Sequence, residues 1–268
     1  MSFSFCSVII NLSKKLLNGS VPVREKNERF EPLGNGVEIL VNELYHFSTD
    51  TILLADFSKP KKNSKAVDLG TGCGTIPFIW RRNDKSVKIS AVEIQSGACR
   101  LAENSIEHNG FEDIEVINAD LKELKGVLPF GFFDLVCCNP PYKLSGSGIK
   151  NPENEKLLAR HEESCTLDDI TLAAKNLLQF GGRFCMCQRP ERLTDVMESM
   201  RKNSLEPKRL RFVQQRSDKK PKLFLIEGRR CAKAGNLVVE PVLFIEENGD
   251  FSREMKEIYG VYKEGYDE

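Results

Sequence analysis

The sequence predicts an α/β fold with a doubly wound, mostly parallel sheet and an antiparallel last strand. Between residues 65 and 203, short apolar runs alternate with helix-like segments at a period of about 25 residues, the pattern of parallel strands joined by helices. Right-handed crossovers between such strands build a doubly wound sheet. Two further apolar runs are joined by the polar loop 216–221, which is too short for a helical crossover, so these strands should be antiparallel.

The expected elements can be placed along the chain from their apolar patterns and turn residues. A turn at residues 33–36 leads into an alternating strand up to residue 41, and Ser48-Thr49-Asp50 cap a short helix over 51–57. The expected strands that follow are 66–69, 88–93, 114–118, 133–138, 183–188, 207–214 and 222–229, with a further strand within 237–245. The expected helices are 76–81, 97–109, 167–180, closed by Gly181-Gly182, and 192–203.

The sequence divides the chain into three parts. Residues 1–22 begin with an apolar run, but Lys14 and Lys15 follow that run instead of preceding it, which is the wrong polarity for a signal peptide. We expect a disordered or frayed helical extension there, a leader over 23–60 and one large domain over 61–262. No stretch approaches the ~18 apolar residues of a membrane span, and we expect a cytoplasmic protein.

Composition and charge narrow the classes of protein to consider. The 268 residues are 40% hydrophobic and 29% charged, which is typical of a globular chain and excludes disordered and fibrous classes. The nine cysteines form no CxxC pair and several lie in apolar runs, so we expect buried thiols in a reducing compartment and no metal site. Net charge is zero, but residues 201–233 contain twelve Lys/Arg against three Asp/Glu, which indicates either a solvated face or a surface for phosphate.

A glycine loop follows the first strand of the large domain. Its sequence is Asp68-Leu69-Gly70-Thr71-Gly72-Cys73-Gly74, and glycines at alternate positions let the backbone approach a ligand and adopt dihedrals that a side chain forbids. The spacing is not the GxGxxG of dinucleotide binders, and the loop lacks the lysine of a phosphate-binding loop. Asp68 would also repel a phosphate. The loop is therefore either an ordinary turn or part of a site for an uncharged or cationic ligand.

Two more acids end the next two strands and favour the ligand site. Glu93 can accept both hydroxyls of a ribose, and Asp120, followed by Leu121, can accept from an adenine amino group. The carboxyl ends of neighbouring strands share one edge of an open sheet, so the three acids and the glycine loop predict a nucleoside pocket. A nucleoside attached to a cationic group fits an acidic pocket best, and S-adenosyl-L-methionine is such a ligand.

The tetrapeptide Asn139-Pro140-Pro141-Tyr142 ends the fourth strand. Its prolines cannot donate to a sheet ladder, so the strand stops and the side chain of Asn139 is held at the ligand-binding edge. The amide oxygen and nearby carbonyls can accept hydrogen bonds from an amino group, and Tyr142 offers a face on which a planar ring can stack. The alternative is a strand end closed by a turn, because Asn-Pro commonly opens one.

Taken together, these motifs resemble the S-adenosylmethionine-dependent amino methyltransferases, which have a Rossmann-like fold. Within that class the chain is similar, from about residue 28 to residue 260, to the bacterial tRNA(Val) adenine-37 N6-methyltransferase family. The segments that carry this resemblance are Tyr45-His46-Phe47-Ser48-Thr49-Asp50, Ala159-Arg160-His161-Glu162, Arg189-Pro190-Glu191-Arg192-Leu193 and Glu206-Pro207-Lys208-Arg209-Leu210-Arg211. Gln188 departs from the pattern, because a histidine is expected there.

The resemblance implies a role for each of these segments. The tetrapeptide would hold and methylate N6 of an adenine in tRNA, and the segment with Phe47, Ser48 and Asp50 would close over the methionine end of the cofactor. The residues expected to contact the RNA are Arg160, His161, Arg189, Lys208, Arg209 and Arg211. Because alternate residues of a strand face opposite sides, the last three cannot all face the RNA.

Other functions stay open on the sequence. An N4-cytosine or DNA adenine methyltransferase is one of them, although no target-recognition insert is visible. A protein-glutamine N5-methyltransferase would use the same tetrapeptide on a side-chain amide, but it predicts a separate helical substrate domain before the glycine loop. A non-catalytic binding subunit with this fold would tolerate loss of the glycines or of Asn139, and all of these residues are present.

Overall fold

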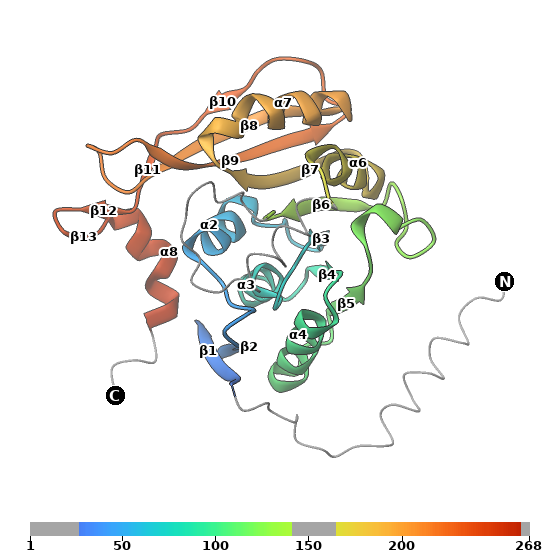
Figure 1. Cartoon of the computed structure of the whole chain (residues 1–268), viewed down its shortest axis with the longest axis vertical. Coiled ribbons are helices and arrows are strands. Elements are labelled where there is room, and N and C mark those ends of the chain that lie inside the picture. Colours follow the sequence, from blue (N-terminus) through green and yellow to red (C-terminus); the bar gives the residue numbers. More distant parts are fainter. Residues whose placement is uncertain (1–26, 141–164, 264–268) are drawn as a thin grey trace.

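The structure is a computed structural model that describes residues 27–140 and 165–263 (Figure 1). Its centre is a nine-stranded sheet in the described part of the chain. The strands are β3 (Lys65–Leu69), β4 (Lys88–Glu93), β5 (Ile114–Asn118), β6 (Phe133–Cys138), β7 (Leu178–Gln188), β8 (Leu205–Gln214), β9 (Pro221–Arg230), β10 (Val238–Val239) and β11 (Leu243–Phe244). The order across the sheet is β10-β8-β9-β7-β6-β3-β4-β5, with β11 also paired to β8.

The predicted doubly wound topology is confirmed. Strands β3 to β7 pair in parallel. Strand β3 is the first of them in the sequence and lies in the middle of the sheet, with β4 and β5 on one side and β6 and β7 on the other. Strand β9 is antiparallel to both β7 and β8, as the short loop at 216–221 predicted. The further strand expected within 237–245 is two short strands, β10 and β11, which extend the sheet along β8.

Helices cover both faces of this sheet (Figure 1). The described helices of four residues or more are α2 (Thr49–Ser58), α3 (Thr75–Asn83), α4 (Ser96–Asn109), α6 (Leu167–Leu177), α7 (Leu193–Lys202) and α8 (Arg253–Lys263). Alternate residues of β6 divide between the two faces: Leu135 and Cys137 pack in the core with α2 and α3, and Val136 and Cys138 pack in the core with α6 and α7. Both faces are apolar, which explains the unbroken apolar run that ends at the tetrapeptide.

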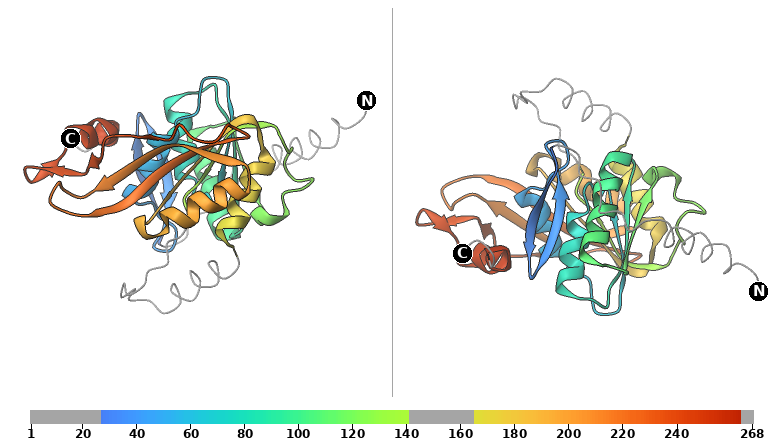
Figure 2. Two further views of the ribbon diagram at one scale, coloured as in Figure 1. Left: turned by 90° about the horizontal axis from the view of Figure 1, so that it is seen from above. Right: turned by 90° about the horizontal axis from the view of Figure 1, so that it is seen from below.

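The leader contains a hairpin where the sequence indicated only a turn and one strand. Strand β1 (Arg29–Gly34) pairs with β2 (Val37–Val41) across Asn35-Gly36, and both turn residues have positive φ, 52° and 72°. Asn-Gly is the commonest pair for this kind of turn, so the signal was present and the first strand was missed. Figure 2 shows the hairpin between α4 and α8, a C-terminal helix that the sequence analysis did not predict.

The expected helix over 167–180 was too long. Helix α6 ends at Leu177, and β7 begins at Leu178 and includes Gly181-Gly182, which were expected to stop the helix. Gly181 has φ of 74°, and a Cβ on Gly182 would lie 3.1 Å from the carbonyl oxygen of Phe133 on the neighbouring strand. The register of β6 against β7 shifts at this point. The glycines therefore form an irregularity in the strand, where the backbones approach closely.

None of the described helices is long and apolar enough to cross a membrane.

Candidate functional site

A cavity of about 560 Å³ lies at the carboxyl ends of β3 to β7. The predicted site residues that line it are Phe47, Asp68, Gly70, Thr71, Gly72, Glu93, Asp120, Leu121, Asn139 and Pro140. Other predicted residues lie within the described chain but do not line the cavity: Ser48, Asp50, Gly74, Arg189, Lys208, Arg209 and Arg211. Pro141, Tyr142, Arg160 and His161 lie outside the described residues.

The three glycines of the loop have two different structural roles. All have positive φ, 71° at Gly70, 58° at Gly72 and 95° at Gly74, which disfavours any residue with a side chain. A Cβ added to Gly70 or Gly72 would meet no atom within 4 Å, so these two leave open space in the cavity. A Cβ on Gly74 would lie 3.1 Å from the Phe78 ring, so Gly74 allows α3 to begin and pack.

Asp68 is buried at the end of β3 without a hydrogen bond to one of its oxygens. Its side chain is 1% exposed, and neither Asp68 Oδ1 nor the hydroxyl of Thr71 has a hydrogen-bond partner among the described residues. Burial raises the pKa of the Asp68 carboxyl to about 8; the nearby Thr71 hydroxyl opposes this rise without reaching hydrogen-bond geometry, and the charge of Glu93 adds to it. Both polar groups border the cavity, so a cationic or hydrogen-bonding ligand would satisfy them.

Glu93 connects the glycine loop to the end of β4. Its Oε2 accepts from the backbone N–H of Gly72 at 2.9 Å, and its Oε1 accepts from that of Gln95 at 2.9 Å. Each carboxylate oxygen has a second lone pair, so both can still accept from a ligand such as a ribose. The leader reaches the same point, because the Tyr45 hydroxyl donates to Gln95 Oε1 at 3.1 Å.

Asp120 lies on the far side of the cavity, where it caps a short 3₁₀ turn, Leu121–Glu123. Its Oδ1 accepts from the backbone N–H of Lys122 at 2.9 Å, and its Oδ2 lies 3.5 Å from Lys122 Nζ. The turn fixes the carboxylate at the end of the loop after β5. Asp68, Glu93 and Asp120 thus occupy three successive strand ends, in the sheet order β3, β4, β5, as predicted from their positions.

Asn139 is held from two sides by residues that the sequence analysis did not assign to the site. Its Nδ2 donates to the hydroxyl of Thr51 at 2.9 Å, and its Oδ1 accepts from the thiol of Cys187 at 3.0 Å. Thr51 belongs to the first turn of α2 and Cys187 to the end of β7. These two contacts together fix the plane of the Asn139 amide in the cavity.

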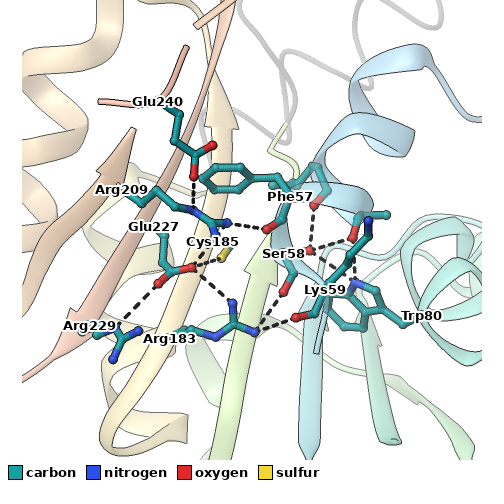
Figure 3. A network of polar contacts seen from close by, with 12 residues as sticks. Phe57, Ser58, Lys59, Trp80, Arg183, Cys185, Arg209, Glu227, Arg229 and Glu240 are labelled. Atoms are coloured by element: carbon teal, nitrogen blue, oxygen red, sulfur yellow. Dashed lines mark hydrogen bonds and ion pairs between the residues drawn. The ribbon is translucent and has the colours of Figure 1, made fainter. Parts of the chain in front are cut away.

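The basic stripe on β8, which consists of Lys208, Arg209 and Arg211, makes contacts within the fold, and Figure 3 shows those of Arg209. The Arg209 guanidinium lies 3.9 Å from the centre of the Phe57 ring, donates to the Phe57 carbonyl and lies 3.5 Å from Glu227. Arg211 makes a bidentate pair with Glu254 at 2.6 and 2.7 Å, and Lys208 donates to the carbonyl of Lys233 at 2.6 Å. Contact of these three cations with RNA stays a prediction, and for Arg209 and Arg211 it would compete with these pairs.

The structure adds cavity residues on the side of β7 and α6. Gln188 at the end of β7, Arg192 after it, and Cys165, Thr166, Leu167 and Ile170 around the start of α6 line the cavity. A sequence signal existed for the helix start, because Thr166 and Asp169 form a capping box. Nothing in the local sequence indicated that this helix start faces the glycine loop, since the two are brought together only by the sheet.

The cavity fits the predicted cofactor. Among the described residues, Asp68 Oδ1 is buried without a partner beside two glycines that leave open space, which suits the cationic methionine end. Glu93 and Asp120 line the same cavity from the next two strand ends, and their carboxylates can accept from the ribose and the adenine of a nucleoside. An amide acceptor, Asn139, lies at the next strand end in the same cavity. A cofactor site beside an amino-acceptor site, at the edge of this sheet, defines an S-adenosylmethionine-dependent methyltransferase.

Comparison with known proteins agrees with this class. The family model described as "Methyltransferase small domain" matches residues 47–205, and the chain belongs to that family. Among curated relatives, a tRNA1(Val) (adenine(37)-N6)-methyltransferase of Parabacteroides distasonis is 29% identical over 67% of this chain and 74% of its own length. A protein of the same name from Haemophilus influenzae is 31% identical over 50% of this chain and 57% of its own.

A solved structure supports the fold alone. The crystal structure of a predicted O-methyltransferase from Agrobacterium tumefaciens aligns with a TM-score of 0.66 and 18% identity, over 80% of this chain and 97% of that one.

Proposed function

We propose that the enzyme methylates the N6 amino group of adenine in tRNA, at position 37 of the anticodon loop of tRNA(Val). The observation that carries the proposal is the side-chain amide of Asn139, oriented by Thr51 and Cys187 inside the cavity that also contains Asp68 and Glu93. An amide oxygen and the carbonyl of Pro140 are acceptors for an amino group. The relatives named tRNA1(Val) (adenine(37)-N6)-methyltransferase supply the substrate and the position.

In this mechanism the chain orients the acceptor. Asn139 Oδ1 and the Pro140 carbonyl accept hydrogen bonds from the two N6 hydrogens, which draws the nitrogen lone pair out of conjugation with the ring. The same two acceptors stabilise the amino hydrogens as they become more acidic during alkylation. Bound S-adenosylmethionine supplies a methyl group on a positively charged sulfur. Because that methyl is already activated, orientation and proximity account for most of the acceleration, and transfer itself requires no general base. The methylated nitrogen carries one proton too many, and it releases that proton to water after transfer.

The cofactor contacts are also part of the proposal. Asp68 and the backbone at Gly70 to Gly72 would hold the methionine end, Glu93 the ribose and Asp120 with Leu121 the adenine. Phe47 lines the same cavity from the leader, and Tyr45 hydrogen-bonds Gln95 near the ribose position, which supports packing of the leader, 23–60, on the cofactor site. Ser48 and Asp50 lie next to Phe47 and Thr51 and stay predicted as part of this closure.

The RNA must present the target base outside its stack. Extrusion of a base costs little in an anticodon loop, which is single-stranded, so the enzyme needs contacts to the base and the flanking phosphates only. Among the described lysines and arginines, Arg192 lines the cavity, so it would meet a phosphate next to the extruded base in competition with its pair to Asp195 at 2.7 Å. An enzyme with a tRNA substrate would work in the cytoplasm.

The experiment that tests the proposal uses the full-length protein, labelled S-adenosylmethionine and total tRNA from a strain that lacks the modification. Labelled N6-methyladenosine, measured by nucleoside mass spectrometry, is the expected product, and the Asn139→Ala variant should give none. Transcripts of tRNA(Val) with guanosine in place of A37 then test the position. Label in protein glutamine with no labelled nucleoside would contradict the proposal and favour a protein methyltransferase.

A further inference from the structure

The side chain of Gln188 is buried in the cavity with its amide orientation fixed. Gln188 ends β7 and is 5% exposed, and its Oε1 accepts from the backbone N–H of Arg189 at 2.8 Å. A backbone N–H can only donate, so the atom facing it must be the oxygen. The other end of the amide, Nε2, is therefore a donor in a known place, and it has no hydrogen-bond partner among the described residues.

The position of Gln188 assigns it to the acceptor half of the cavity. In the sheet order β7-β6-β3-β4-β5, the three acids of the cofactor site lie on β3, β4 and β5, and β7 lies on the other side of β6. Asn139 follows β6 and contacts Cys187, the residue just before Gln188. Gln188 thus lies next to Asn139, which would hold the amino group that is methylated. The end of β6 separates Gln188 from Asp68, Glu93 and Asp120.

Asn139 and Gln188 lie on different sides of the sheet edge, so they would contact the target base from two sides. Successive side chains of a strand point to opposite faces, and Cys187 packs with the α2 side while Met186 packs with the α6 side. Gln188 therefore extends on the α6 side, where Ile170 and Arg192 line the same cavity. A planar group bound between the two amides would meet an acceptor, Asn139 Oδ1, and a donor, Gln188 Nε2.

We propose that Gln188 Nε2 donates a hydrogen bond to the ring nitrogen next to the amino group of the target base, and so selects adenine. This inference rests on the proposed function. Adenine has an acceptor nitrogen, N1 or N7, on either side of its amino group, which complements a donor beside an acceptor. Guanine presents a carbonyl in place of that amino group, so Asn139 Oδ1 would have no donor to pair with. At N1 guanine also presents an N–H where adenine has an acceptor, so Gln188 Nε2 would be unpaired there; at N7 guanine keeps the acceptor, and Asn139 alone would discriminate against it.

The selectivity follows from burial. When a base binds and displaces water from Gln188 Nε2, that donor has a desolvation cost unless the base supplies an acceptor, so a base with the acceptor is favoured over one that lacks it. For one neutral hydrogen bond in a buried site, we expect a difference of about ten- to hundredfold in affinity. Gln188 is therefore a specificity-determining residue, because it distinguishes a base with an acceptor nitrogen at this position from a base without one.

The test is a binding measurement with modified anticodon stem-loops. Loops with adenosine, 1-deazaadenosine or 7-deazaadenosine at the target position are titrated into full-length enzyme saturated with S-adenosylhomocysteine. Wild type should lose about ten- to hundredfold affinity for one of the two analogues. Gln188→Met, which keeps the length but has no donor, should bind adenosine and that analogue equally. Gln179→Met, at the opposite end of β7, is the matched control and should discriminate like wild type.

Two results would overturn the assignment: equal binding of all three loops by wild type, or undiminished discrimination by Gln188→Met. If that variant does not fold, Gln188→Glu keeps an oxygen for the Arg189 N–H and still removes the donor, and the wild-type comparison stands by itself. Failure of the proposed function looks different. In that case wild type would not distinguish an adenosine loop from a uridine loop at all, and no N6-methyladenosine would form.

Discussion

Replacing Asp68 with asparagine should stabilise the ligand-free enzyme, by an amount that grows with pH. In the folded chain the carboxyl has a pKa of about 8 against an ordinary value of 3.8, because it is buried. The folded state therefore holds a proton that the unfolded state releases between these two values. The stability that Asp68 contributes is fully present below the ordinary pKa and is lost as pH rises through the folded one. Asparagine has no such proton to lose.

The size of the effect follows from the difference of about four pKa units. Each unit corresponds to about 1.4 kcal/mol, so near pH 7 the Asp68→Asn variant should gain up to roughly 4 kcal/mol relative to its difference from wild type near pH 4. The gain should increase up to about pH 8 and stay constant above it.

Urea unfolding of both ligand-free proteins at several pH values measures this difference directly. Titrating groups that do not interact with Asp68 cancel in the subtraction, whereas the coupling of Asp68 to Glu93 is part of the measured difference. A difference that does not change between about pH 4 and pH 8 would refute the assigned pKa. The same variant should bind S-adenosylmethionine more weakly, because a cation loses its buried carboxylate; equal affinity would separate Asp68 from the cofactor site.

Three further predictions concern the acceptor site and the basic stripe. Asn139→Ala should abolish methyl transfer and leave cofactor affinity within a few fold, measured by calorimetry. Thr51→Val, which keeps the shape but removes the hydroxyl that holds Asn139 Nδ2, should lower kcat about tenfold without changing cofactor affinity, and Thr51→Ser should restore it. Arg209→Ala should lower the free energy of unfolding by about 1–3 kcal/mol, because Glu227 keeps fewer partners, whereas Lys208→Ala should not.

These variants also have outcomes that would contradict the reasoning. Loss of cofactor binding in Asn139→Ala would make that residue structural. A Thr51→Ser enzyme as slow as Thr51→Val would show that the hydroxyl does not act through its hydrogen bond. An Arg209→Ala protein of wild-type stability, with weaker and less salt-dependent RNA binding, would return Arg209 to the RNA surface.

The parts of the site that the sequence predicted are those fixed by backbone geometry within a few residues. Strand β6 ends at Cys138, two residues before Pro140, as expected, and the positive φ of Gly70 and Gly72 is the reason for the glycine loop. Acids directly after parallel strands meet at one edge whatever lies between them, so Glu93 could be assigned without the structure.

The parts that were missed depend on contacts between distant segments. Thr51 and Asn139 are separated by 88 positions, and only the packing of α2 on the sheet joins them. Arg209 looked like a phosphate ligand because its partners, Phe57 and Glu227, come from other elements. The end of α6 was misplaced for a related reason: β7 pairs with β6 from Leu178 onward, and that pairing outweighs the helix pattern.

The arginine contacts at the carboxyl end of α2 determine where the other end of the helix holds Asn139. Arg183 donates to the carbonyls of Ser58 and Lys59 at 3.1 and 2.8 Å, and Arg209 donates to that of Phe57, so this end of α2 is fixed to β7 and β8 (Figure 3). Thr51 lies at the opposite end, and a helix turns by about 100° per residue. The number of residues in α2 between its fixed end and Thr51 therefore sets the position and direction of the Thr51 side chain. One residue inserted within α2 would rotate the Thr51 hydroxyl about the helix axis and away from Asn139, although no residue that lines the cavity would be replaced.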